Sequence, residues 1–264
     1  MIFLKTEDEI ELLRKSNILV GKTLAEVAKY IQPGVTTAEL DKVAEEFIRD
    51  NNAEPTFRGF PNPYGEKRFP ASICTSVNGQ VVHGIPGSYE LREGDIVSVD
   101  CGVKLNGFCG DSAYTFCVGE VSEKVRNLLE VTKRALYIGI EEATEGNRVG
   151  NIGNAIQQYC ESHSYGVVRE FAGHGIGKEM HEDPFVPNFG KSGTGAMLKR
   201  GMCIAIEPMI TMGNRQVVLE NDDWTVRTVD GSWAAHFEHS VAISAGKADV
   251  LSSFRFIEEV LRNK

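Results

Sequence analysis

The sequence predicts an α+β fold made of two related halves, and three observations lead to this prediction. Capping-box patterns at Thr6 to Glu9 and at Thr36 to Glu39 mark the starts of two helices. The dipeptide Asn106-Gly107 is the strongest short signal for a tight β-hairpin. The segment from Leu91 to Asp100 also matches the segment from Leu198 to Glu207, since each reads leucine, a basic residue, a variable residue, glycine, five further residues and a carboxylate.

This internal similarity extends to the residues upstream. His83-Gly-Ile precedes the first copy, and His174-Gly-Ile precedes the second. A separation of roughly a hundred residues is too long for a solenoid repeat, so it indicates a duplicated unit. We therefore expect one domain over residues 1–264, in which two halves, 1–120 and 121–250, pack about a pseudo-twofold axis.

The first half begins with two helices. They are expected to end at about residues 31 and 51, the first because Pro33-Gly34 follows it. Residues 55–70 are expected to be irregular because they contain Pro55, Pro61, Pro63 and Pro70. Strands are then predicted over 71–83, 95–104 and 108–118.

The second half also opens with helices and continues in strands. The helices are expected over 121–143 and 149–164, and the strands over 166–173, 202–212, 216–220, 224–229 and 233–244. Asp230-Gly231 is a second hairpin signal. Residues 252–264 are expected to form a short amphipathic helix.

The first hairpin brings two carboxylates together. Counting outward from the Asn106-Gly107 turn places Gly102 opposite Asp111, with Asp100 on the same face. The carboxylates are then diagonal neighbours, roughly 7–8 Å apart at the backbone, and Gly102 leaves the space between them empty. Two like charges directed into one gap are costly unless a cation lies there. The alternative is a pair of solvated carboxylates beside a turn.

Three further residues could complete a cation site. His174 lies in Gly-His-Gly-Ile-Gly, Glu207 ends an apolar run, and Glu238 lies in a strand-like stretch. Each alone is typical of ordinary surface or core positions. The glycines around His174 do not form a dinucleotide-binding loop, because the G-x-G-x-x-G spacing and the acidic residue expected after it are missing.

Together, the candidate ligands resemble the dinuclear metal site of the bacterial type I methionine aminopeptidases. The ordered set is Asp100, Asp111, His174, Glu207 and Glu238, in contexts that include Ile-Glu-Pro and Glu-His-Ser. The resemblance extends from the first predicted helix to about Ala245. It implies the pita-bread fold, an antiparallel sheet covered by helices, and removal of N-terminal methionine when the second residue is small.

The resemblance also implies a division of roles among the ligands. Asp100 holds a first metal ion, His174 and Glu207 hold a second, and Asp111 and Glu238 bridge both. Such an oxygen-rich set suits Co²⁺, Mn²⁺, Fe²⁺ or Zn²⁺. A hydroxide activated by the two ions is expected to attack the first peptide carbonyl, while Glu207 carries the proton to the leaving amine.

The same resemblance assigns further site residues. His181 is expected to hydrogen-bond the scissile carbonyl, and His83 to contact the substrate backbone beyond it. The methionine pocket is expected to be walled by Phe69, Cys74, Met180 and Trp224. Met180 departs from the family, where an aromatic residue is common, and so does the long segment 57–69. His163, His236 and His239 are expected to be structural or on the surface, although His239 could orient Glu238.

Three alternative classes of protein share this fold or derive from it. Prolidases and proline aminopeptidases share the ligands but carry a large N-terminal domain, for which there is no room before residue 70. Type II methionine aminopeptidases carry a long late insert, whereas Glu207 and Glu238 are only 31 positions apart. A non-catalytic relative is expected to lose ligands, and all five are present. Metal content and methionine release would separate these alternatives.

Composition limits the partners. A net charge of −9 without a run of basic residues argues against specificity for nucleic acid or anionic membranes. No apolar stretch approaches membrane-span length, and the acidic N-terminal segment is not expected to be a signal peptide. Its six cysteines form no C-x-x-C pair, which favours a reducing cytoplasm. The expected partners are nascent polypeptide N-termini, the expected state is a monomer, and docking at the ribosome is left open.

Overall fold

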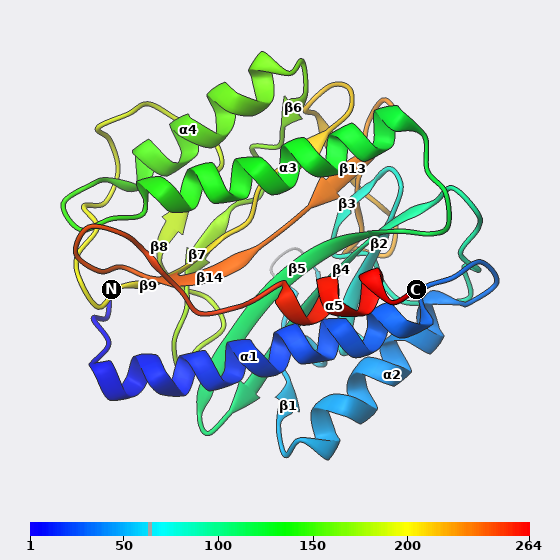
Figure 1. Cartoon of the computed structure of the whole chain (residues 1–264), viewed down its shortest axis with the longest axis horizontal. Helices are drawn as coiled ribbons and strands as arrows, with labels where there is room; N and C mark the ends of the chain where they lie inside the picture. Colours follow the sequence, from blue (N-terminus) through cyan, green and yellow to red (C-terminus); the bar gives the residue numbers. More distant parts are fainter. Residues whose placement is uncertain (63–64) are drawn as a thin grey trace.

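Two pairs of helices lie on opposite sides of the central strands, one in the lower and one in the upper part of Figure 1. The computed structural model describes residues 1–62 and 65–264. The helices of this part are α1 (Glu7–Tyr30), α2 (Thr37–Asp50), α3 (Glu123–Glu142), α4 (Val149–Ser162) and α5 (Arg255–Arg262). The strands of the first half are β1 (Glu54–Pro55), β2 (Ile73–Val77), β3 (Gln80–Val82), β4 (Ile96–Leu105) and β5 (Phe108–Cys117). Those of the second half are β6 (Gly166–Val167), β7 (Gly173–Gly175), β8 (Glu182–Val186), β9 (Cys203–Ile206), β10 (Met209–Thr211), β11 (Val217–Leu219), β12 (Val226–Thr228), β13 (Ala234–His236), β14 (His239–Ala242) and β15 (Asp249–Val250).

Capping boxes begin α1 and α2, as predicted. The Thr6 hydroxyl accepts a hydrogen bond from the Glu9 amide at 3.3 Å, and the Glu9 carboxylate accepts one from the Thr6 amide at 3.0 Å. Thr36 and Glu39 make the same two bonds at 3.2 and 2.7 Å. These bonds satisfy amides that a first helical turn leaves without partners.

Matched positions of the two halves make the same backbone contacts. The Gly34 amide donates to the Leu91 carbonyl at 2.7 Å, and the Gly146 amide donates to the Leu198 carbonyl at 3.0 Å. Both glycines have a φ of +89°, a conformation that other residues rarely adopt. Helix α1 packs on β4 and β5, whereas α3 packs on β9, β10 and β13. The contacts therefore agree with a duplicated unit.

The predicted hairpin is formed by β4 and β5. Gly102 lies opposite Asp111, in the expected register. Asn106 and Gly107 have φ values of +53° and +82°, as a type I′ turn requires. Strand β4 also pairs with β1 and β2, so the hairpin sits inside a four-stranded sheet.

The chain changes sheets at two carboxylates. Continuous strands were predicted over 202–212 and 233–244, but both are broken. Strands β9 and β14 belong to the five-stranded sheet β15-β14-β9-β7-β8, whereas β10 and β13 belong to the sheet β13-β10-β6. Glu207 lies between β9 and β10, where the following proline cannot donate to a ladder. Glu238 lies between β13 and β14, and its amide donates to the Ala113 carbonyl of β5 at 3.0 Å.

Other differences from the sequence prediction have local causes. Asp230-Gly231 forms a turn but no hairpin, because β12 pairs with β11 and β3 while β13 pairs with β10. The unpredicted strand β8 contains Pro184, which is tolerated because β8 lies at a sheet edge. Residues 71–83 divide into β2 and β3 around a turn, and β1 extends into the stretch expected to be irregular. Pro63, also predicted to be irregular, lies outside the described residues.

The C-terminal tail forms the expected short helix and packs on α1. A Cβ atom at Gly21 of α1 would lie 2.8 Å from the Ser253 carbonyl oxygen, so the contact requires glycine. Ile257 of α5 is fully buried.

All six cysteines are free. No helix in the described part of the chain combines the length and apolar character of a membrane span.

Candidate metal centre and active site

One cavity of about 940 Å³ brings together most of the predicted site residues. Its lining includes Asp100, Asp111, His174, Glu207 and Glu238, the histidines His83 and His181, and the apolar residues Phe69, Cys74 and Trp224. These residues come from both halves of the chain. A concave site with a few converging polar groups is the usual location of catalysis.

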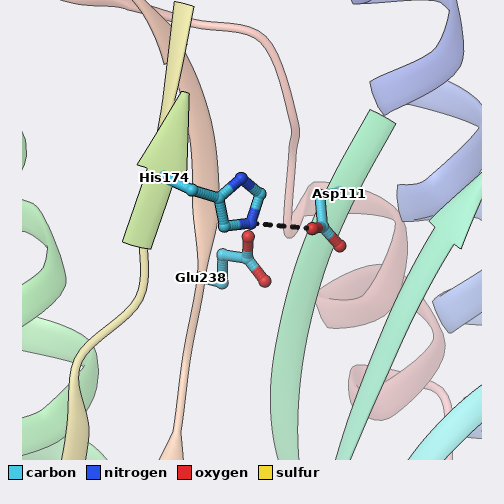
Figure 2. A group of neighbouring side chains, drawn as sticks. All are labelled: Asp111, His174 and Glu238. Atoms are coloured by element: carbon cyan, nitrogen blue, oxygen red, sulfur yellow. Dashed lines mark ion pairs between the residues drawn. The ribbon is translucent and has the colours of Figure 1, made fainter. Parts of the chain in front are cut away.

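Three of the predicted ligands form a compact group, shown in Figure 2. One ligand atom from each of Asp111, His174 and Glu238 lies within 4.8 Å of the other two. His174 Nε2 is 3.5 Å from Asp111 Oδ2. The Nδ1 atom of His174 donates to the Gly175 carbonyl at 2.9 Å. In the neutral ring this bond leaves the Nε2 lone pair facing the carboxylates, as in many metal-bound histidines.

The two remaining carboxylates reach the same cavity. Glu207 Oε1 is 3.8 Å from His174 Nε2. Asp100 lies on β4 two residues before Gly102, the partner of Asp111, so the two aspartates share one face of the hairpin.

Several carboxylate oxygens of the cavity lack a protein partner. Among the described residues, Asp100 Oδ1, Asp111 Oδ1 and Glu238 Oε1 are buried and accept no hydrogen bond. Leaving buried polar atoms unpaired is costly, so their arrangement favours a bound cation. Carboxylate oxygens and an imidazole nitrogen are donors that divalent transition ions accept. The residues present therefore fit divalent metal ions.

The pKa shifts of the carboxylates in the cavity also favour bound metal ions. Desolvation, followed by the charges of Asp111 and Glu207, raises the pKa of Asp100 well above its usual value, and the same causes raise that of Glu238. For Glu207, desolvation is outweighed by the hydrogen bond with His236 and by the charges of His174 and His236, so its pKa is lowered. Divalent cations would relieve the repulsion among these buried groups.

The space beside Gly102 is filled. A Cβ atom there would lie 2.2 Å from Thr56 Oγ1, 2.4 Å from Met180 Cε and 3.0 Å from Phe57 Cε1. The prediction of empty space between the aspartates was therefore wrong. The glycine instead allows three side chains to pack directly against β4 beside the site.

Two histidines of the cavity are neutral at physiological pH. Desolvation lowers the pKa of His83 to about 4, and desolvation with the His174 charge lowers that of His181 to about 4. The His181 ring lies edge-on to the His174 ring, with centroids 4.2 Å apart. The backbone of His83 has a φ of +59°, which is strained for a residue with a side chain. Strained residues of this kind cluster at functional sites.

One wall of the cavity is apolar. Phe69, Cys74 and Trp224 belong to one buried cluster, in which the Phe69 and Trp224 rings pack edge to face at 5.2 Å. Met180 belongs instead to a second apolar cluster with Leu13, and within the described chain it is not among the residues that line the cavity. Met180 packs instead beside Gly102 of β4.

His236 is a site residue that the sequence analysis missed. The ring is buried, and its Nε2 atom lies 3.5 Å from Glu207 Oε2. The available signal was its position two residues before Glu238, since alternate residues of an extended chain share a face. The His239 ring makes its hydrogen bonds elsewhere: Nδ1 lies 2.6 Å from Ser252 Oγ of the tail, and Nε2 lies 3.4 Å from the Tyr137 hydroxyl of α3.

The ligand set of this cavity is typical of proteins that bind divalent metal ions and use them to activate water. Residues 11–245 match the profile of metallopeptidase family M24. The chain belongs to metallopeptidase family M24.

Its relatives at high identity share one name. A methionine aminopeptidase of Clostridium perfringens is 52% identical over 252 residues, which cover 96% of this chain and 99% of the relative. Methionine aminopeptidase 1 of Bacillus subtilis is 48% identical over 96% of this chain and 99% of the relative. The crystal structure of the Rickettsia prowazekii methionine aminopeptidase has a TM-score of 0.92 at 40% identity, covering 96% of this chain and 100% of that chain. Prolidase from Pyrococcus furiosus shares the fold, with a TM-score of 0.76 at 23% identity over 95% of this chain and 65% of that chain. The predicted family and the pita-bread fold are confirmed.

Proposed function

We propose that this chain is a methionine aminopeptidase that removes the N-terminal methionine from nascent proteins and peptides when the second residue is small. One observation carries the proposal: five ligand-type residues converge on one cavity, in a chain 52% identical to a methionine aminopeptidase over nearly its whole length. The 264 residues form a single catalytic domain that acts as a monomer in the cytoplasm, where nascent chains appear.

The proposed cofactor is a pair of divalent ions, Co²⁺, Mn²⁺, Fe²⁺ or Zn²⁺. Asp100 would hold one, His174 and Glu207 would hold the other, and Asp111 and Glu238 would be ligands to both. Bound ions of this kind polarise a carbonyl and supply a nucleophile at neutral pH. The unpaired oxygens of Asp100, Asp111 and Glu238 support this assignment.

The protein groups around the ligands have distinct proposed tasks. Glu207 moves the proton to the leaving amine, since it reaches the cavity beside His174 and its lowered pKa leaves it ionised. Neutral His181 donates a hydrogen bond to the scissile carbonyl oxygen as negative charge develops. His83, whose ring lies edge-on to the Trp224 ring, contacts the substrate backbone beyond the scissile bond.

The apolar wall is the proposed methionine pocket. Phe69 and Trp224 present aromatic surface to an unbranched thioether, and sulfur–aromatic contacts contribute about 0.3–1.5 kcal/mol each. Cys74 completes the wall.

Peptides test the substrate assignment. The initial rate of methionine release from Met-Ala-Ser should exceed that from Met-Ile-Ser at least about 100-fold, because a steric wall rejects a branched second residue more strongly than a lost methylene would. Ala-Pro serves as the control substrate for prolidase activity. Faster cleavage of Ala-Pro than of Met-Ala-Ser would contradict the proposal.

Metal removal tests the cofactor assignment. Chelated protein should gain about 2.7 kcal/mol of stability when Mn²⁺ is added at a hundredfold its dissociation constant. For a chain of this size the melting temperature then rises by about 5–10 °C, measured by calorimetry. Asp95→Asn, which changes a buried carboxylate outside this cavity, is the matched control and should keep the rise. A chelated wild type that shows no rise with any of the four ions would count against the metal centre.

A further inference from the structure

A buried ion pair joins the start of the chain to the segment that carries His181. Lys5 Nζ contacts Glu182 Oε2, although the two residues are 177 positions apart. The side chains are only 6% and 9% exposed. Lys5 immediately precedes the α1 cap, and Glu182 is the first residue of β8. Charged residues are rarely this buried unless they are paired.

The Glu182 carboxylate organises the turn around His181. While Oε2 accepts from Lys5, Oε1 accepts a hydrogen bond from the Glu179 amide at 3.4 Å. A Cβ atom at Gly177 would lie 2.2 Å from Glu182 Oε1 and 2.7 Å from Lys5 Cε, so the pair packs tightly against this turn. The Lys5 amide also donates to the Gly201 carbonyl at 2.7 Å, which fixes the lysine to the turn before β9.

His181 depends on this turn for its position. In residues 1–62 and 65–264 its side chain has ring contacts with Phe60 and His174 but no hydrogen bond to the protein. The imidazole is therefore placed by its backbone, and the backbone on either side is held through Glu182.

We infer that Lys5, acting through Glu182, is a positioning residue that holds His181 in the geometry needed for the reaction. Removing the ammonium leaves a buried carboxylate without its partner, which then moves toward water and takes the turn with it. A misplacement of about 1 Å at a catalytic group can cost about 100-fold in rate. The inference rests on the proposed role of His181.

A cycle of variants tests the inference on the full-length, Mn²⁺-loaded enzyme. Lys5→Met should lower kcat for Met-Ala-Ser by at least about tenfold with KM changed by less than about threefold, since the lost interaction acts on the transition state. In the His181→Ala background the same change should lower kcat by less than about twofold, because the group that it positions is gone. Lys5→Arg, which keeps the charge, should recover part of the rate.

The controls separate positioning from general stability. Arg14→Met breaks an ion pair between α1 and Asp249 at 2.6 Å that does not touch the His181 turn, and should leave kcat unchanged. Hydrogen exchange of residues 177–182 should accelerate in Lys5→Met and not in Arg14→Met. If Lys5→Met does not fold, the double variant Lys5→Met with Glu182→Gln removes the unpaired charge and should still show a reduced kcat.

Three outcomes would overturn the positioning role. They are an unchanged kcat in Lys5→Met, an equal loss of kcat in the wild-type and His181→Ala backgrounds, and unchanged exchange of residues 177–182. A wild type that releases no methionine would instead refute the proposed function, while the exchange measurement would still decide whether Lys5 holds the turn.

Discussion

Replacing Asp111 with asparagine should nearly abolish methionine release while the protein stays folded. The change keeps the size of the side chain but removes a charge from the centre of the group formed by Asp111, His174 and Glu238. We expect a fall in kcat/KM of at least about 1,000-fold, equivalent to about 4 kcal/mol of transition-state stabilisation. Initial rates on Met-Ala-Ser with added Mn²⁺ measure it.

The stability of the same variant gives an independent readout. Without metal, desolvation and then the charges of neighbouring carboxylates, Asp111 among them, raise the pKa of Asp100 and Glu238. Asp111→Asn removes one of these charges, so the metal-free variant should melt no lower than metal-free wild type. Its melting temperature should hardly respond to Mn²⁺. Activity within tenfold of wild type would rule out the two-metal assignment.

Two histidine variants should lose activity for different reasons. His174→Ala should lose both activity and the Mn²⁺-induced rise in melting temperature, because Nε2 of His174 faces the carboxylate group. His181→Ala should lower kcat by about 100- to 1,000-fold, the usual effect of removing a donor to a developing oxyanion, while the rise in melting temperature survives. Parallel kinetics and calorimetry distinguish the two.

His163→Ala is the control for both histidine variants. His163 is exposed at the end of α4, away from the cavity, and its ring bonds to the Tyr159 carbonyl. This variant should match wild type in kcat and in its metal response. Equal loss of the metal response in His174→Ala and His181→Ala would show that the proposed division of roles is wrong.

The sequence by itself determined the features that depend on local interactions. The Thr6 and Thr36 caps and the Asn106-Gly107 turn each involve residues a few positions apart, so propensity and hydrogen-bonding patterns suffice to locate them. The register that brings Asp100 and Asp111 to one face follows from the turn alone, because strand periodicity is fixed.

Only the tertiary structure decided where the chain leaves one sheet for another. Apolar patterning made 202–212 and 233–244 look continuous, because a strand that changes partners keeps the same local pattern. The breaks place Glu207 and Glu238 in the cavity, and with them His236 beside Glu207. The packing of Met180 against Gly102 and the burial of Lys5 with Glu182 were likewise decided by contacts between distant segments, which no local pattern encodes.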